Sequence, residues 1–151
     1  QITSLDEDKR AQIRGKDVGF VFQSFHLMPR LTALDNVMLP LEISGDLRSA
    51  DKAYEALKQV GLSNRAKHFA TQLSGGEKQR VAIARSIVNK PKILFADEPT
   101  GNLDKKSSSS ITDLIFSLNE LIQTTLVLVT HDLSLAEKCD EVYELSEGQL
   151  L

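Results

Sequence analysis

Three short segments have a continuously apolar centre. They are residues 17–22 (DVGFVF), 92–97 (KILFAD) and 125–132 (TLVLVTHD). We expect a buried strand in each run, and the lack of alternation in the second predicts a strand covered on both faces, as in a parallel sheet. A last strand is expected at 141–145, followed by a turn into an edge strand.

Helical periodicity marks several segments between these runs. Residues 49–60 place four apolar side chains on one helical face, and Gly61 is a suitable residue to end that helix. Residues 111–122 have the strongest amphipathic pattern, with apolar side chains recurring at helical spacing. Ser134 and Glu137 have the spacing of a capping box, which predicts a short helix there.

Strands and helices alternate at both ends of the chain, whereas the middle is mostly helical. This order predicts an α/β fold with a parallel sheet and an inserted helical subdomain. The expected divisions are a part of the core with its strand at 1–23, the helical subdomain at 24–90, and the rest of the core at 91–151.

Composition narrows the class of protein without naming a chemistry. A chain of 151 residues suits one domain, and its net charge of −3 argues against a nucleic-acid partner. The single cysteine, Cys139, excludes an intrachain disulfide and fits a reducing, cytoplasmic setting. No apolar run is long enough to span a bilayer. A start at Gln1 with polar residues is typical of a cut or unresolved boundary and equally of a processed terminus.

Two carboxylates, Asp97 and Glu98, directly follow the second apolar run. Ligands of open α/β sheets bind at the carboxyl ends of the strands, so this pair is a candidate for holding Mg²⁺ and for activating a water that attacks a phosphate. Strands that end in a charged turn are common, and the pair alone leaves both interpretations open.

The stretch LSGGEKQ at residues 73–79 combines a helix start with two glycines. Ser74 and Glu77 form a capping-box pattern, which is sufficient reason for a well-capped helix. Glycines in a first turn weaken a helix, and their presence at Gly75 and Gly76 indicates close approach to the backbone. A helix N-terminus with free N–H groups is a ready anion site.

These motifs occur in one order with Gln23 after the first strand and His131 after the third. The chain thereby resembles the ATP-binding subunits of ATP-binding cassette (ABC) transporters. FQSFHLMP resembles their Q-loop, LSGGEKQR their signature, ILFADEPTGNLD their Walker B motif and D-loop, and VTHD their switch histidine. The resemblance covers essentially the whole chain.

By this resemblance, four residues at strand ends have roles at a Mg²⁺–ATP site. Gln23 contacts Mg²⁺ and the attacking water and relays to transmembrane permease subunits. Asp97 serves Mg²⁺, and Glu98 is the general base. His131 holds the γ-phosphate and senses its loss.

The resemblance also implies that a second copy of the ATPase completes the site. Ser74, Gly75 and Gly76 would grip the γ-phosphate of ATP held by that copy, and Gln79 would support them. Asp104, in the D-loop, would contact the opposite protomer. The result is a nucleotide-sandwich dimer.

One motif of the family, the P-loop G-x-x-x-x-G-K-S/T, does not occur in these 151 residues. The resemblance therefore implies a partial P-loop NTPase (RecA-like) core, in a fragment that is inactive alone. Two alternatives stay open: a soluble cassette ATPase without a transport role, and a non-enzymatic regulatory fragment. The short interval of residues 24–72, without sustained heptads, favours the transporter type.

Within the transporters, the chain resembles the lipoprotein-release and macrolide-export type, with the ATPase on the cytoplasmic face of the membrane. The apolar cluster of Phe25, Leu27, Met28 and Leu31 is either core or a groove for a short helix of the permease.

Overall fold

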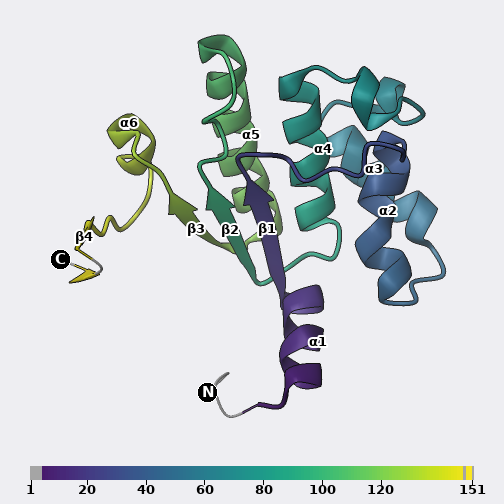
Figure 1. Cartoon of the computed structure of the whole chain (residues 1–151), viewed down its shortest axis with the longest axis horizontal. Coiled ribbons are helices and arrows are strands. Elements are labelled where there is room, and N and C mark those ends of the chain that lie inside the picture. Colours follow the sequence, from purple (N-terminus) through teal and green to yellow (C-terminus); the bar gives the residue numbers. More distant parts are fainter. Residues whose placement is uncertain (1–4, 148, 151) are drawn as a thin grey trace.

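A computed structural model describes residues 5–147 and 149–150 of the chain (Figure 1). Its helices and strands follow in the order α1 (Glu7–Asp17), β1 (Val18–Phe22), α2 (Ala33–Ile43), α3 (Ser49–Gln59), α4 (Gly75–Ile87), β2 (Ile93–Asp97), α5 (Lys105–Ile122), β3 (Thr125–Val129), α6 (Leu133–Ala136), β4 (Leu145–Ser146) and β5 (Gln149–Leu150). Two short 3₁₀ turns, Ser63–Arg65 and Ala70–Gln72, lie between α3 and α4.

The centre of the structure is a three-stranded parallel sheet in the order β1-β2-β3. Val18 pairs with Ile93 at one end of β1 and Phe22 with Asp97 at the other, and Asp97 in turn pairs with Val129. The three predicted strands and their parallel arrangement are confirmed. Since all three strands end in register, the residues that follow them emerge at one edge of the sheet.

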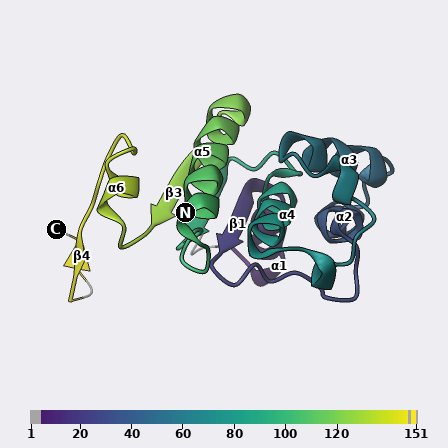
Figure 2. The same ribbon diagram turned by 90° about the horizontal axis from the view of Figure 1, so that it is seen from above.

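One face of the sheet is buried under helices α4 and α5. Val21, Leu94 and Ala96 are almost fully buried there, and they share a hydrophobic core with Ile111 and Ile115 of α5. The contact with α4 is close: a Cβ atom added to Gly19 would lie 2.4 Å from the carbonyl oxygen of Ser86. Figure 2 shows α4 beside β1 and α5 beside β3.

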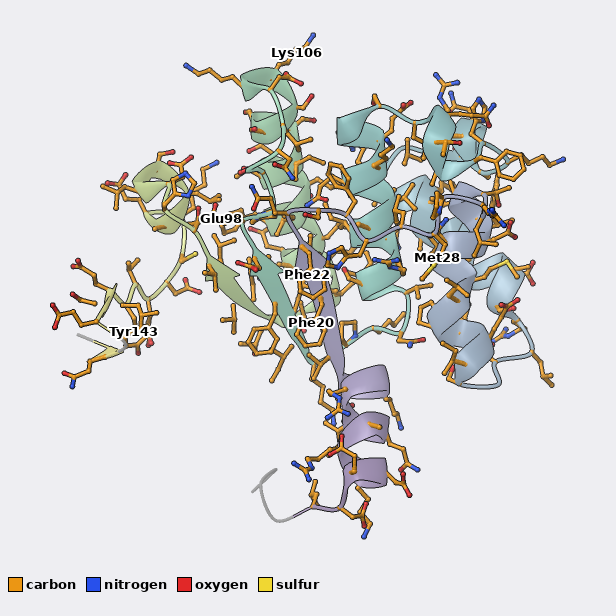
Figure 3. All side chains as sticks on the ribbon, in the orientation of Figure 1. Phe20, Phe22, Met28, Glu98, Lys106 and Tyr143 are labelled. Carbon is orange, nitrogen blue, oxygen red and sulfur yellow. The ribbon has the colours of Figure 1, made fainter. Side chains whose placement is uncertain are left out.

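The opposite face of the sheet is apolar but largely open. Phe20 stacks on Phe22 and Phe95, with ring centroids 5.8 and 5.5 Å away, yet it is 40% exposed (Figure 3). Val127 and Val129 are also exposed. The prediction that residues 92–97 are covered on both faces is therefore wrong for the described part of the chain. An apolar run shows only that the strand's side chains are suited to burial on both faces. No described element covers the second face of the sheet.

Helices α2, α3 and α4 pack together at the side of the sheet, where they share a core. Helix α2 begins with a capping box in which Thr32 and Asp35 exchange hydrogen bonds. Helix α3 is followed by Gly61 at φ 75°, the left-handed conformation predicted for a helix end. The boundaries of a helical subdomain at residues 24 and 90 stay a prediction.

The amphipathic helix expected at 111–122 is confirmed as the C-terminal two thirds of α5. Ile111, Ile115 and Leu118 recur on its buried face. None of the helices in the described residues is long and apolar enough to cross a membrane.

Two predictions for the C-terminal part are wrong. Asp132, not Ser134, caps α6, because its side chain accepts hydrogen bonds from both the backbone N–H and the hydroxyl of Ser134. Residues 141–144 form no strand. Strand β4 pairs antiparallel with β5 in a separate hairpin whose strands have two residues each. The turn and edge strand expected after residue 145 correspond to this hairpin.

Candidate functional site

The carboxyl ends of β1, β2 and β3 bring Gln23, Asp97, Glu98 and His131 to one edge of the sheet. Figure 3 shows Glu98 at the end of β2. The backbone N–H of Glu98 donates to the carbonyl oxygen of Val129 at 2.9 Å, which ties the turn after β2 to the last residue of β3.

The strongest contact at this edge joins Glu98 and His131. Oε1 of Glu98 accepts hydrogen bonds from the backbone N–H of His131 at 2.9 Å and from its Nδ1 at 2.7 Å. The second bond needs a proton on Nδ1, which leaves Nε2 as the atom able to contact a ligand. The imidazole is 85% exposed, whereas the Glu98 side chain is only 23% exposed.

Glu98 holds this position with a left-handed backbone at φ 44°. Such a conformation costs a non-glycine residue about 1 kcal/mol, and in proteins it concentrates at functional sites. The hydroxyl of Thr130 lies 3.5 Å from Oε2 of Glu98, which leaves that oxygen the less occupied of the two. The carboxylate is thus oriented by His131 on one side and available on the other.

Gln23 is fixed by the loop that follows Glu98. Its side-chain amide donates to Oδ1 of Asn102 at 3.2 Å, and the Asn102 amide donates to the Gln23 backbone oxygen at 3.0 Å. A Cβ atom on Gly101 would lie 2.6 Å from Nε2 of Gln23, so only glycine allows this approach without displacing the amide. The glutamine thereby lies beside the turn that carries Glu98.

Asp97 is exposed at the end of β2, opposite Phe22 and Val129 in the sheet. No group of three or more His, Cys, Asp or Glu side chains suited to a metal occurs among the described residues. One aspartate with a neighbouring amide is the donor set expected for Mg²⁺ bound mainly through water and substrate phosphates, rather than in a protein cage. The residues present fit that kind of ion.

The signature stretch forms the start of α4. Ser74 is the N-cap and exchanges capping-box hydrogen bonds with Glu77, which confirms the cap predicted from their spacing. The backbone N–H of Ser74 lowers the pKa of the Glu77 carboxyl below its usual value, and hydrogen bonds from the Ser74 hydroxyl and Arg65 act in the same direction. Burial opposes this shift.

The fold of this chain does not require glycine at positions 75 and 76. A Cβ atom on Gly75 would lie 3.4 Å from Leu103, and one on Gly76 would lie 3.4 Å from Ser107, both tolerable contacts. Both residues are helical, and neither has a positive φ. Alanine therefore fits both positions in the isolated chain, and the reason for glycine lies outside the chain's own packing.

Gln79 lies inside the protein rather than at the helix start. Its side chain is fully buried, and its Nε2 donates to the backbone oxygens of Pro99 at 2.6 Å and Phe22 at 3.4 Å. Its Oε1 has no partner among the described residues. Gln79 thus connects α4 to the turns after β1 and β2.

Asp104 caps helix α5 from an exposed position. Its carboxylate accepts hydrogen bonds from the hydroxyl of Ser107 at 2.6 Å and from its backbone N–H at 3.0 Å. These bonds lower the pKa of Asp104. The cap anchors the loop between Glu98 and α5 to the helix that follows.

Four further residues, Gly101, Asn102, Thr130 and Arg85, contact the predicted site residues or their loops. Gly101, Asn102 and Thr130 lie inside the recognised motifs, but no role was predicted for them, because their contacts join segments far apart in the chain. The structure adds them as neighbours of Gln23, of Glu98 and of the loop after β1.

The profile of the family described as "ABC transporter" matches residues 1–101. The chain belongs to the ABC transporter family. It is 53% identical over 149 residues to the ABC transporter ATP-binding protein YbbA of Escherichia coli strain K12, covering 97% of this chain. It is 50% identical over 148 residues to the lipoprotein-releasing system ATP-binding protein LolD of Legionella pneumophila strain Paris, again covering 97% of this chain.

Solved structures support the same family. The dimeric post-hydrolysis structure of the ATP-binding cassette MJ0796, bound to ADP and Pi, superposes with a TM-score of 0.84 at 42% identity, covering 97% of this chain and 66% of that one. A second dimeric structure of MJ0796, described as a bacterial ABC transporter cassette, gives a TM-score of 0.75 at 46% identity, over 88% of this chain and 60% of that one. This ABC chain spans 65% of the length of YbbA and of LolD.

Proposed function

We propose that this chain is part of the ATP-hydrolysing subunit of an ABC transporter and carries its general base, signature and switch histidine. The observation that supports this most directly is the Glu98–His131 pair beside Asp97 and Gln23, at the end of three parallel strands. The proposed architecture is the P-loop NTPase (RecA-like) core with an inserted helical subdomain. ATP and Mg²⁺ are the proposed ligands.

In this mechanism Glu98 accepts the proton of the attacking water through Oε2, since His131 occupies Oε1. His131 donates from Nδ1 to Glu98 and, when its ring also carries a proton on Nε2, donates from Nε2 to the terminal phosphate. Asp97 precedes Glu98 at the end of β2, and Gln23 follows the neighbouring strand β1. These two side chains would hold Mg²⁺ and orient the water. Bound Mg²⁺ neutralises phosphate charge at this edge.

A second copy of the subunit supplies the remaining contacts. Ser74, Gly75 and Gly76 present an exposed helix N-terminus, which favours an anion, and its glycines have no role in the chain's own packing. Asp104 is exposed, and the preceding residue, Leu103, lies beside Gly75, so we expect Asp104 to face the partner. The solved MJ0796 cassettes are dimers, which agrees with this arrangement.

The proposed activity needs a longer polypeptide than these 151 residues. The P-loop motif is absent from the sequence, and its backbone and lysine supply the main phosphate contacts in such enzymes. For the experiments below, the completed cassette is this chain joined to the part of YbbA that has no counterpart in these 151 residues. The 151 residues alone are expected to be inactive.

The proposed membrane partners are permease subunits, which would hold the ATPase at the cytoplasmic face of the membrane. Met28 is 52% exposed, and Phe25, Leu27 and Leu31 are half-buried, so the cluster is partly available at the surface. A separate cavity of about 310 Å³ between β1, α2 and α4 is lined by other residues, among them Phe22, Leu39 and Arg85. Leu27→Asp with Met28→Asp should reduce permease co-purification while ATP hydrolysis by the completed cassette persists. Loss of the fold would instead assign the cluster to the core.

Replacing the general base tests the proposed reaction. Glu98→Gln in the completed cassette keeps the shape of the side chain but cannot accept a proton, so phosphate release should fall at least about a hundredfold. ATP binding, followed with a fluorescent analogue, should be retained. Glu120→Gln, an exposed residue of α5, is the matched control and should remain active. A fully active Glu98→Gln protein would contradict the assignment.

A further inference from the structure

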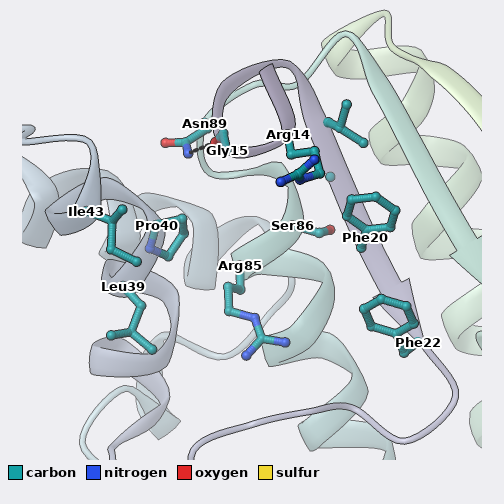
Figure 4. Close-up of a pocket in the computed structure, with 12 residues that line it drawn as sticks. Arg14, Gly15, Phe20, Phe22, Leu39, Pro40, Ile43, Arg85, Ser86 and Asn89 are labelled. Carbon is teal, nitrogen blue, oxygen red and sulfur yellow. Dashed lines mark hydrogen bonds between the residues drawn. The ribbon is translucent and has the colours of Figure 1, made fainter. Parts of the chain in front are cut away.

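Arg85 of α4 reaches into the loop that follows β1. Its guanidinium donates to the backbone oxygen of His26 at 2.7 Å and to that of Phe25 at 3.0 Å. Figure 4 shows the side chain extending between Leu39 of α2 and Phe22 at the end of β1. Among the ion pairs of the described residues none involves Arg85, so backbone carbonyls are its hydrogen-bond partners.

Arg85 remains a cation in this setting. Burial lowers its pKa from the usual value, but an arginine starts far above neutral pH. A charged, partly desolvated donor bound to two carbonyls makes stronger hydrogen bonds than a neutral one. The contact therefore restrains the loop more than an ordinary surface hydrogen bond would.

The loop held by Arg85 has an unfavourable backbone. Phe25 and His26 are consecutive non-glycine residues with φ of 61° and 48°. Each left-handed residue is disfavoured and persists only where surrounding contacts determine its conformation. Arg85 bonds the carbonyls of these two residues, and the His26 ring packs 4.8 Å from the ring of Phe22.

A second residue of the same helix holds the other end of this loop. Gln79 donates to the carbonyl of Phe22, the residue immediately before Gln23. Helix α4 thus attaches to the chain on both sides of Gln23, once through Gln79 and once through Arg85. The remaining contact of Gln23 is its reciprocal pair with Asn102.

We propose that Arg85 is a positioning residue that fixes the loop of Gln23 to the signature helix, so that the start of α4 and Gln23 move as one unit. This inference rests on the proposed function, in which Gln23 orients Mg²⁺ and water while α4 meets the nucleotide of a second copy. Displacement of either one would then be transmitted to the other through Arg85.

Amide hydrogen exchange on the 151-residue chain tests the attachment without nucleotide. The N–H groups of Phe25 and His26 are bonded within the loop, to Phe22 and Ser24, and report its opening. Arg85→Met keeps an apolar stem and removes the donors, so exchange of these two amides should rise about tenfold, the effect of losing a hydrogen bond to a charged group.

Arg80→Met is the matched control, since Arg80 lies on the same helix and donates to the carbonyl of Val60 and the hydroxyl of Ser110 instead. It should leave both loop amides unchanged. Arg85→Lys, which places one compact donor where the guanidinium bridges two carbonyls, should give an intermediate rise and serves if the methionine variant does not fold. Unchanged loop exchange, or an equal rise in the amides of β2, would overturn the proposal.

Steady-state hydrolysis by the completed cassette tests the consequence for the reaction. Arg85→Met should lower kcat about tenfold and leave KM for ATP within about twofold, because the loop orients water without gripping the nucleotide. Arg85→Lys should recover part of kcat, and Glu120→Gln, the exposed control on α5, should match the unmodified protein. An unchanged kcat in Arg85→Met, with Gln23→Ala impaired, would overturn the positioning role alone; full activity of Gln23→Ala would remove the proposed role of Gln23 as well.

Discussion

The residues at the strand ends and those at the start of α4 differ in their hydrogen bonds and packing within this chain. Glu98 and His131 are joined by hydrogen bonds of 2.9 and 2.7 Å, and Gln23 is bonded at 3.2 Å to Asn102 in the neighbouring turn. Among the described residues the Ser74 side chain is bonded to Glu77 alone, in the capping box, and the packing around Gly75 and Gly76 would accept alanine. The first group is organised within one copy, whereas the second is exposed and its glycines are unexplained by that copy.

This difference separates two kinds of functional residue. A group that must orient a proton acceptor needs partners in its own chain, which is why Glu98 tolerates a strained backbone. A group that receives an anion from another molecule needs an open approach and free N–H donors instead. The comparison therefore supports the proposal that the signature meets a second copy, while the proposed general base is organised within one copy.

Replacing a signature glycine should affect activity and stability in opposite directions. Gly75→Ala adds a methyl group that the chain's own packing accepts, so unfolding of the 151 residues should cost about 0.5 kcal/mol more. The same methyl group would obstruct the partner's phosphate, and hydrolysis by the completed cassette should fall about a hundredfold. Urea unfolding and phosphate release measure the two effects.

Gly15→Ala is the control for this substitution, since no atom lies within 4 Å of the added Cβ. Gly15 is also helical, so the stability gain should be similar while activity stays unchanged. If Gly75→Ala destabilises the chain, the glycine is required by the fold and the comparison fails at this residue.

A smaller effect concerns the pH dependence of the cap. The folded state lowers the pKa of Glu77, so its contribution to stability is fully present above the unfolded value of about 4.3 and is lost as the pH falls through the folded value. Glu77→Gln should lower the free energy of unfolding by about 0.5 kcal/mol at neutral pH, and the difference should disappear in acid below the folded pKa.

Urea unfolding of both proteins between about pH 7 and pH 2 measures this difference. The exposed residue Glu120 provides the control, since it takes part in no helix cap. Glu120→Gln should therefore not lower the free energy of unfolding as Glu77→Gln does. A difference that persists undiminished at the lowest pH would show that the charge of Glu77 does not stabilise the helix.

Helices and strands could be predicted where their own residues show a clear apolar or amphipathic pattern. The strands around Val21, Leu94 and Leu126 are apolar runs, and α5 repeats Ile111, Ile115 and Leu118 at helical spacing, so local pattern sufficed. The motifs also predicted which residues follow strand ends, and parallel pairing then brought Glu98 and His131 together.

Contacts between distant segments could not be predicted in this way. Asn102 binds Gln23 across 79 positions, and Arg85 binds Phe25 across 60. Neither residue has an unusual local pattern. The bare face of the sheet escaped prediction for a related reason, because apolar side chains such as Phe20 indicate what can be buried and not which element is present to cover it.

The central claim is that α4 of one copy completes the site of another, and solution mass tests it most directly. Glu98→Gln in the completed cassette should be monomeric without nucleotide and dimeric with Mg²⁺–ATP, by light scattering, because unhydrolysed ATP holds two copies together. Adding Ser74→Arg places a bulky cation at the partner's phosphate and should leave the protein monomeric with ATP, while its affinity for ATP stays nearly unchanged. A double variant that still dimerises, or one whose monomer no longer binds ATP, would contradict the account.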